Sequence, residues 1–360
     1  MQKLNIYRNK RVFLTGHTGF KGSWLNLMLQ NFGAEVFGYS LPPKDKLNHF
    51  DLLNMNNGVF KDILDIKSLS KALLDFNPHI IFHLAAQPLV RESYKDPINT
   101  FQTNAIGTLN ILEVARKLKE LSAIVVITTD KVYENKEWIW GYRENDTIGG
   151  GCDPYSSSKA CAEIITNSMQ QSFFNLKNFN KTHRVLIATA RAGNVIGGGD
   201  FSDDRLIPDL MRGIQRNEAT LIRHPNSTRP WQNVLEPLRG YMMLGEKLME
   251  GKSEFATSFN FGPSMEGNLS VKCILEETKK LWNKINYKIQ IPNADKSLYE
   301  ANLLMLDSTK ANNILKWKPI YDSFYSIKTT IQWYKAFYES NEILSHSQLK
   351  NYINESKMNA

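Results

Sequence analysis

The chain has 360 residues, of which 42% are hydrophobic and 22% charged, and its formal net charge is +8. These values are typical of a globular protein with a large core, and the length favours two domains or one domain with a substantial lobe. A basic chain suits an anionic ligand. It carries no Lys/Arg block, zinc-finger spacing or RNA-binding signature, so we expect no nucleic-acid partner.

The cysteines and the apolar runs bear on the cellular compartment. Cys152, Cys161 and Cys273 form no CxxC pair, which favours reduced thiols over a disulfide framework or a metal site. The N-terminus lacks an apolar stretch of signal-peptide length, and runs such as "AIVVI" have the length of a strand. We therefore expect a cytoplasmic protein that holds no metal and does not enter a membrane.

Up to about residue 190, short apolar runs alternate with longer amphipathic ones. In chain order the pattern predicts a strand at 11–15, a helix at 20–32, strands at 35–39 and just before Asp62, a helix at 66–76, a strand at 79–86, a helix at 98–119, a strand at 123–129, a helix from Pro154 and a strand at 184–190. Strands separated by helix-length segments pair in parallel, because each crossover needs a dozen residues or more. The sequence therefore predicts an α/β fold, a doubly wound parallel (Rossmann) sheet.

We assign residues 1–190 to this sheet domain, with a return segment at about 231–256. At about 191–230 and 257–360 the pattern changes to short strands, proline turns and amphipathic helices. We expect these residues to form a smaller α+β lobe over the carboxyl edge of the sheet, where open α/β sheets bind ligands. The last residues, "NESKMNA", are expected to fray.

Three glycines, Gly16, Gly19 and Gly22, lie between the first strand and the first helix. A triphosphate-binding P-loop is excluded, because Lys21 precedes Gly22 instead of following it. The spacing fits a dinucleotide loop, in which the first glycine permits the turn, the second admits a pyrophosphate to the helix N-terminus and the third lets the helix pack on the strand. A simple tight turn is the alternative.

The second strand ends in "VFGYS", with neither an acidic residue for the ribose of NAD nor an arginine for the extra phosphate of NADP. This favours NAD without deciding the question. Asp62 is a candidate contact to the adenine edge, and a helix N-cap is the alternative for it.

A set of polar residues has the types needed for proton transfer. Thr129 and Asp130 follow a predicted strand, and Tyr155 and Lys159 lie one helical turn apart. A tyrosine with a pKa of about 10 acts as a base at neutral pH only when a cation stabilises its phenolate, and Lys159 supplies such a charge. A surface Tyr/Lys pair on an amphipathic helix is the alternative.

The glycine loop, "HLAAQ", the Tyr155/Lys159 pair and Asn104 resemble the extended short-chain dehydrogenase/reductase family. Over nearly the whole chain, further motifs are similar to the CDP-glucose 4,6-dehydratase branch of that family: "TGHTGFKGSWL", "QPLVRESY", "TTDKVYEN", "WGYREND", "RAGNVIGGGD", "RLIPD" and "RPWQNVLEP". One departure is Tyr299-Glu300-Ala301, where the branch has "HEA".

The resemblance implies an NAD-dependent lyase that converts CDP-glucose to CDP-4-keto-6-deoxyglucose, for deoxysugars of surface polysaccharide such as lipopolysaccharide O-antigen. It implies that Tyr155 takes the proton of the 4-hydroxyl, which Thr129 positions. Lys159 would lower the tyrosine pKa and hold the nicotinamide ribose, and Asp130 would protonate the leaving 6-hydroxyl. Lys131 is either the base at C5, which requires a neutral lysine, or a charge that stabilises the enolate.

The resemblance also implies two sets of binding residues. The cofactor set is Gly16, His17, Thr18, Gly19, Phe20, Gly22, Ser40, Asp62, Ile63, Leu84, Ala85, Ala86, Asn104, Tyr155 and Lys159. The substrate set is Gln87, Arg91, Asn194, Arg205 and Arg229, whose arginines suit diphosphate oxygens. A structural ion pair is the alternative for each arginine, above all for Arg91 and for Arg191.

Several alternatives stay open. His17 either weakens the grip on the pyrophosphate, so that NAD exchanges, or is an exposed polar loop residue. The segment "EWIWGYRE" is either a lid over the sugar or part of the core. The family is dimeric, and the helices after Ile98 and Tyr155 are candidates for the interface of a homodimer or homotetramer.

Two rival functions remain beside the dehydratase. A nucleotide-sugar 4-epimerase needs the Tyr155/Lys159 pair but no acid at Asp130. A non-enzymatic NAD-binding regulator needs neither the pair nor the acid, and the presence of Thr129 together with Tyr155 and Lys159 argues against it.

Overall fold

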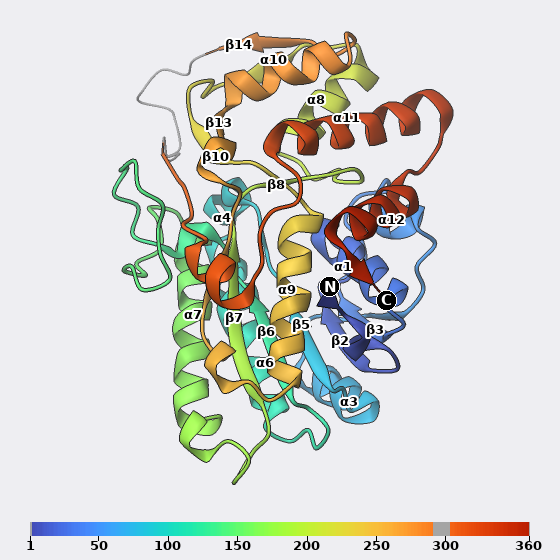
Figure 1. Cartoon of the computed structure of the whole chain (residues 1–360). Helices are drawn as coiled ribbons and strands as arrows, with labels where there is room; N and C mark the ends of the chain where they lie inside the picture. The colour runs from blue at the N-terminus through green and yellow to red at the C-terminus, as the bar shows by residue number, and fades with distance from the viewer. Residues whose placement is uncertain (1, 291–302, 360) are drawn as a thin grey trace.

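The computed structural model describes residues 2–290 and 303–359 (Figure 1). Its centre is a seven-stranded sheet in the order β12-β7-β6-β5-β2-β3-β4, in which all neighbours pair in parallel. The strands are β2 (Arg11–Thr15), β3 (Glu35–Ser40), β4 (Gly58–Phe60), β5 (Ile80–His83), β6 (Ala123–Ile127), β7 (Leu186–Ala192) and β12 (Phe259–Phe261). The predicted doubly wound parallel sheet is confirmed.

Helices cover both faces of the sheet, and successive strand residues point to opposite faces. Val12 and Leu14 pack in one core with α1 (Phe20–Asn31) and α9 (Leu235–Met249). Phe13 packs in the other core with α3 (Ile66–Phe76), α6 (Gly107–Ala115) and α7 (Pro154–Phe173). Burial on both faces explains why these strands are continuous apolar runs in the sequence.

Two predicted elements differ from the structure by more than two residues. The strand predicted at 79–86 ends at His83, because residues 84–86 form a loop. The helix predicted at 98–119 is divided into α5 (Pro97–Phe101), a π-helical turn (Gln102–Ile106) and α6. The chain leaves the helix after Ala115 and buries Leu118 and Leu121 in the second core.

A second group of elements lies above the carboxyl edge of the sheet (top of Figure 1) and has a core of its own around Trp231, Ile274 and Trp333. Its helices are α8 (Leu206–Arg216), α10 (Val271–Leu281) and α11 (Ser323–Ser340). Its strand pairs are β9 (Thr220–Ile222) with β14 (Tyr287–Ile289) and β10 (Thr228–Pro230) with β13 (Asn268–Ser270).

Further short elements are α2 (His49–Leu52), α4 (Val90–Lys95) and the pair β8 (Val195–Ile196) and β11 (Gln232–Asn233). The division into two domains stays a prediction, although β12 joins the sheet from beyond the return segment predicted at 231–256. The segment Tyr299-Glu300-Ala301 lies outside the described residues. Within them, no helix combines the length and apolar character needed to cross a membrane.

Over the described residues 354–359, the prediction that the C-terminus frays is wrong. After α12 (Ser345–Ser356), β15 (Met358–Asn359) pairs in parallel with β1 (Gln2–Lys3), and Figure 1 shows the two termini side by side. The Met358 side chain is fully buried in the core that α1 and α9 share. One apolar residue in a polar tail therefore anchors the end of the chain.

We expect Met358→Ala to lower the free energy of unfolding by about 2–4 kcal/mol, the usual cost of truncating a buried methionine. Urea denaturation of the variant and of the parent protein measures this difference. Glu355→Ala, which truncates an exposed residue of α12, is the control and should change stability little. Equal stabilities for the two variants would contradict the anchoring role.

Candidate active site

The site lies where the strand order reverses, since β2 has β3 on one side and β5 on the other. Open α/β sheets bind ligands outside the carboxyl ends of their strands at such a point. Two loops meet there, because a Cβ at Gly16 would lie 2.7 Å from the backbone nitrogen of Ala85. The glycine loop after β2 and the loop after β5 therefore border one crevice.

The glycine loop has the shape of a dinucleotide cradle. Gly16 has a φ of +73°, which glycine adopts without strain. A Cβ at Gly22 would lie 2.0 Å from the Gly16 carbonyl oxygen, so α1 packs directly on the turn. Gly19 is the N-cap of α1 and supplies no capping side chain, which leaves the first N–H groups of the helix for an anion.

The residues expected near the adenosine end of the cofactor lie in two places, at the end of β3 and just before α3. Thr18 Oγ1 lies 2.8 Å from Ser40 Oγ at the end of β3. Asp62 is exposed and accepts a hydrogen bond from the backbone N–H of Leu64 (2.9 Å). The alternative of a helix N-cap at Asp62 is wrong, because Asp65 caps α3.

His17 is fully buried, so the alternative of an exposed polar loop residue is wrong. Its ring packs against Phe50 (5.1 Å between centroids), Phe60 (6.3 Å) and Gly38, where a Cβ would lie 2.2 Å from the ring. Within the described residues neither ring nitrogen has a hydrogen-bond partner, and burial lowers the His17 pKa to about 4. A weakened grip on the pyrophosphate stays a prediction.

Thr129 and Asp130 form a compact unit after β6. Thr129 is the N-cap of a short 3₁₀ turn, and its hydroxyl donates a hydrogen bond to Asp130 Oδ1 (2.9 Å). Asp130 is 2% exposed. Burial raises its pKa above the usual value, while the charges of Lys131 and Arg229 act in the opposite direction. The net shift favours the protonated form, which an acid requires.

Tyr155 and Lys159 lie on the first turns of α7, whose start is fixed by the N-cap Asp153. Lys159 is 6% exposed, and its ammonium donates a hydrogen bond to the carbonyl of Ile127 at the end of β6 (3.1 Å). Burial lowers the Lys159 pKa to about 8, and Glu163 counteracts this shift. The pair is therefore placed on one face of a helix at the crevice, as predicted from its spacing.

The pKa of Tyr155 shifts in the direction opposite to the one expected from the charge of Lys159. Burial raises it to about 12, although the Thr129 hydroxyl that faces the phenol and the charge of Arg205 lower it. The nearby Asp130 raises it further. Burial is the largest contribution, so this tyrosine needs added positive charge before it can act as a base near neutral pH.

A buried ion pair between β7 and α7 holds α7 in place. The sequence analysis named Arg191 but not its partner, Glu163. Arg191 on β7 and Glu163 on α7 are both buried, with Nε to Oε1 at 2.8 Å and Nη2 to Oε2 at 3.0 Å. Thr128 and Thr189 donate hydrogen bonds to the same carboxylate (2.5 and 2.8 Å). The structural alternative for Arg191 is confirmed, and the pair lies one turn after Lys159.

Asn104 is a buried linker beside the site. It lies in the π-helical turn, an irregularity frequent at functional sites. Its Oδ1 accepts a hydrogen bond from the Gln87 N–H (2.8 Å), and its Nδ2 donates to Ser158 Oγ (2.8 Å). The Gln87 side chain is itself bound within its loop, where it donates to Thr100 Oγ1 (2.9 Å). Asn104 thus joins α7 to the loop after β5.

The predicted substrate residues separate into two groups. Arg91 pairs with Asp204 (2.9 Å) at the surface, which is the structural alternative proposed for it. Arg205 pairs with Asp200 (3.1 Å), and its charge lowers the pKa of Tyr155. The charge of the buried Arg229 lowers the pKa of Asp130.

The other residues predicted for binding differ in their exposure. Ile63 is buried, and the half-buried ones are Phe20, Leu84, Ala86 and Asn194.

The segment "EWIWGYRE" belongs only in part to the core, and the alternative of a lid over the sugar stays a prediction. Trp138 packs on Tyr142 (5.3 Å between centroids) beside a small core that also contains Leu306. Ile139 and Trp140 are 73% and 65% exposed. Only the first tryptophan therefore belongs to the core.

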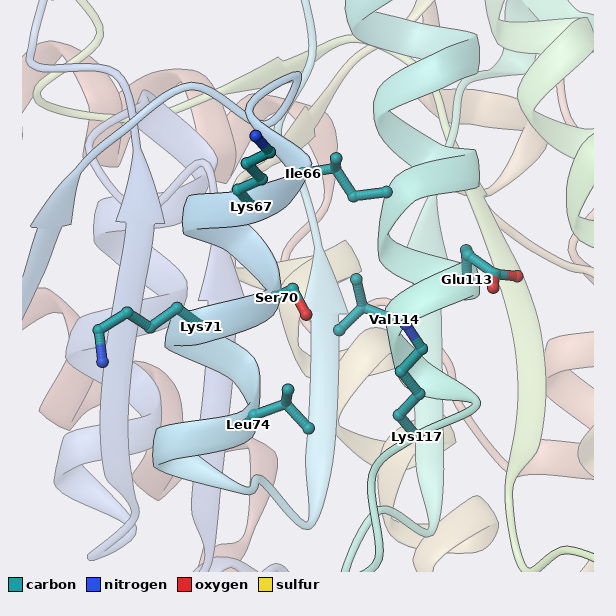
Figure 2. A pocket seen from close by; sticks show the side chains of 8 residues that line it. All are labelled: Ile66, Lys67, Ser70, Lys71, Leu74, Glu113, Val114 and Lys117. Carbon is teal, nitrogen blue, oxygen red and sulfur yellow. The ribbon is translucent and has the colours of Figure 1, made fainter.

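A groove of about 490 Å³ lies between α3 and α6 (Figure 2). Its walls are Ile66, Lys67, Ser70, Lys71, Leu74, Glu113, Val114 and Lys117. It contains none of the residues predicted for catalysis or binding, and it is separate from the crevice described above.

Sequence reasoning used Lys21 only to exclude a P-loop, yet this residue also belongs to the crevice. It is the second residue of α1 and is half-buried. Burial, together with the charges of Arg205 and Lys159, lowers its pKa to about 7, while Asp130 raises it. Its position between Gly19 and Gly22 was the available signal in the sequence.

Comparison with known proteins places this geometry in context. Residues 13–330 match the protein family described as GDP-mannose 4,6 dehydratase. The CDP-glucose 4,6-dehydratase of Salmonella typhimurium is 42% identical over 354 residues, which are 97% of this chain and 98% of that protein.

Two solved structures share the fold. UDP-glucuronic acid 4-epimerase from Bacillus cereus, in complex with UDP-glucuronic acid and NAD, has a TM-score of 0.76 at 22% identity and covers 91% of this chain and 100% of its own. dTDP-glucose 4,6-dehydratase from Bacillus anthracis, in complex with NAD, has a TM-score of 0.72 at 21% identity and covers 92% and 97%.

Proposed function

Because the chain belongs to the GDP-mannose 4,6 dehydratase family, we propose that it is an NAD-dependent CDP-glucose 4,6-dehydratase. The observation that carries this choice is the 42% identity to a CDP-glucose 4,6-dehydratase across nearly the whole of both chains. The product would be CDP-4-keto-6-deoxyglucose, a precursor of deoxysugars for surface polysaccharide such as the O-antigen.

The residues of the crevice suit the cofactor. The N–H groups at the start of α1, reached through Gly16 and Gly19, would hold the pyrophosphate, and Thr18, Ser40 and Asp62 border the adenosine end. NAD, when bound, would supply the acceptor for the hydride of the sugar C4 and the donor of the hydride to C6. Lys159 would hold the nicotinamide ribose.

The chain's own residues would then move the protons of the first step. Tyr155 takes the proton of the 4-hydroxyl, which the Thr129 hydroxyl orients. With a pKa of about 12 in the presence of Lys159, the phenol requires further positive charge, which the bound cofactor would add to that of Lys159. Below a pH of about 8 Lys159 keeps its charge, so this support weakens as the pH rises through that value.

Elimination follows from the 4-ketone, which acidifies the hydrogen at C5. A base takes that proton, the C6–O bond breaks, and Asp130 gives a proton to the departing hydroxyl, so that water leaves. Burial keeps Asp130 protonated at a higher pH than an ordinary aspartic acid, which suits this role. Lys131 acts as the base or as the charge that stabilises the enolate.

A 4-epimerase is the second candidate, since a 4-epimerase has the same fold. Epimerisation needs the tyrosine and lysine but no acid near C6. The buried Asp130, bonded to Thr129 and surrounded by cations, therefore favours the dehydratase.

We propose a homodimer through α7 and the α5–α6 segment, which pack on each other. Their outer surface exposes Ile98, Phe101, Ile106, Ile164 and Phe173, between 36% and 71%. A second copy of the chain would cover these residues.

Sedimentation equilibrium should therefore give a dimer for the parent protein and a monomer for Ile164→Asp. Leu221→Asp, at an exposed residue of β9, is the control and should stay dimeric. A monomeric parent protein would contradict the proposal.

We also place the enzyme in the cytoplasm. Cys152, Cys161 and Cys273 are free thiols, and Cys152 is exposed. Such thiols suit a reducing compartment.

The substrate assignment predicts a selective reaction. We expect the protein with NAD to convert CDP-glucose to a product lighter by one water, and to leave dTDP-, UDP- and GDP-glucose unchanged. Mass spectrometry of the four separate incubations measures this. Turnover of another nucleotide sugar in preference would contradict the cytidine assignment, and a product of unchanged mass would indicate an epimerase.

The order of the steps predicts different defects in two variants. Tyr155→Phe should form no ketone and no reduced cofactor, with a loss of activity of about a hundredfold or more. Lys131→Met should form the ketone and reduced cofactor but stop before water is lost. Absorbance of the reduced cofactor and mass spectrometry separate the two outcomes. Lys350→Met, at an exposed site, is the control; a fully active Lys131→Met would exclude both roles of that lysine.

A further inference from the structure

Two buried polar residues beside Asp130 have no role in the mechanism above. Tyr241 on α9 and Gln232 on β11 are both fully buried. Within the described residues, the Tyr241 hydroxyl and Gln232 Oε1 have no hydrogen-bond partner, and neither has Asp130 Oδ2. Buried polar atoms that find no partner in the protein usually bind an ordered water molecule.

Asp130 and Gln232 reach the same end of β7. Asp130 Oδ2 lies beside Gly193, since a Cβ at that glycine would be 2.7 Å from it. The backbone N–H of Gln232 donates a hydrogen bond to the carbonyl of Asn194, the next residue (3.3 Å). The side chain of Gln232 donates from Nε2 to the Phe261 carbonyl at the end of β12 (2.8 Å), and β12 is the neighbour of β7 in the sheet.

Tyr241 reaches the same place from α9, which packs on β6 and β7 (Figure 1). Its ring packs against Phe261, whose carbonyl binds Gln232 (5.6 Å between ring centroids). Burial raises the pKa of Tyr241, and the charges of Tyr155 and Asp130 raise it further. The phenol of Tyr241 is therefore close enough to the carboxyl of Asp130 to interact with it.

The hydrogen-bonding capacity of the three groups matches that of one water molecule. Gln232 Oε1 can only accept, and its orientation is fixed because Nε2 of the same amide donates to a carbonyl. The Tyr241 hydroxyl can donate to the water oxygen. The water then directs one O–H to Gln232 Oε1 and the other to Asp130 Oδ2.

We propose that Tyr241 and Gln232 bind a water molecule that donates a hydrogen bond to Asp130 Oδ2, and that both are positioning residues for the acid step. The inference rests on the proposed function in taking Asp130 as the acid. When Asp130 gives its proton to the departing 6-hydroxyl, the C6–O bond breaks, water leaves and a buried carboxylate remains. Thr129 donates to Oδ1 of this carboxylate (2.9 Å), and the bound water would donate to Oδ2.

Hydrogen bonds donated to a carboxylate stabilise its charged form and so make the acid stronger. The groups that face Asp130 from the surrounding elements are Thr129, Lys131, Arg229, Lys21, Tyr155 and Tyr241. In a Tyr241 variant the other five are unchanged. Loss of the Tyr241 hydroxyl should therefore raise the pKa of Asp130 and slow its proton transfer.

Tyr241→Phe tests this effect in rapid-mixing experiments with NAD and CDP-glucose. Absorbance follows the reduced cofactor, and mass spectrometry of quenched samples follows the loss of water. We expect reduced cofactor to form at the parent rate and water to be lost about tenfold more slowly. Tyr7→Phe is the matched control, because Tyr7 is fully buried in the same core and its hydroxyl donates to the Met242 carbonyl of α9 (2.6 Å). It should leave both rates as in the parent protein.

The pH dependence of water loss gives a readout that a packing defect would not produce. The acid acts in its protonated form, so the rate falls as the pH rises through the pKa of Asp130. In Tyr241→Phe this fall should move to higher pH by roughly one unit, although the step itself is slower.

A high-resolution crystal structure of the parent protein tests the water site independently of activity. It should show a water molecule within hydrogen-bond distance of Asp130 Oδ2, Gln232 Oε1 and the Tyr241 hydroxyl. A structure without this water would overturn the inference, and this test remains available if Tyr241→Phe does not fold.

The kinetic outcomes separate the inference from the proposed function. An unchanged rate of water loss in Tyr241→Phe, or an equal slowing in Tyr7→Phe, would overturn the inference and leave the dehydratase intact. Parent protein that removes no water from CDP-glucose would instead contradict the proposed function.

Discussion

Burial of ionisable groups in one crevice is the constraint on which the rest of the site depends. Asp130 and Tyr155 have raised pKa values, and Lys159 and Lys21 have lowered ones. In all four the dominant cause is burial, and each shift favours the neutral form. For Asp130 and the two lysines the shift brings the pKa nearer to neutral pH, where such groups exchange protons readily. The pKa of Tyr155 moves away from neutral pH, so this phenol depends on added positive charge.

Burial of ionisable groups costs free energy of folding, and it is maintained here because close packing fixes the backbone around the crevice. Gly22 packs on Gly16, and Gly16 packs on the loop after β5, so the glycine loop has little freedom to move. On the other side, the Glu163–Arg191 pair ties α7 to β7. Removing one partner of such a buried pair typically costs about 3–5 kcal/mol, so the position of Lys159 depends on residues that touch no substrate.

The sequence contained the local signals of the fold and of the proposed catalytic pair. Glycine spacing, strand-length apolar runs and the helical spacing of Tyr155 and Lys159 depend on neighbouring residues, and all three agree with the structure. Interactions between distant residues were not predictable in this way. The partner of Arg191 lies on another element, and the buried environments of His17 and Met358 arise only when α2 and β4, or the two termini, come together.

The hydride that moves from C4 to C6 of one sugar is the central claim of this account, and isotope tracing tests it most directly. CDP-glucose with deuterium at C4 is converted with unlabelled NAD, and the position of the label in the product is read by NMR. The account predicts deuterium at C6 of a 4-keto-6-deoxy sugar. Deuterium retained at C4 of an epimerised hexose would contradict it.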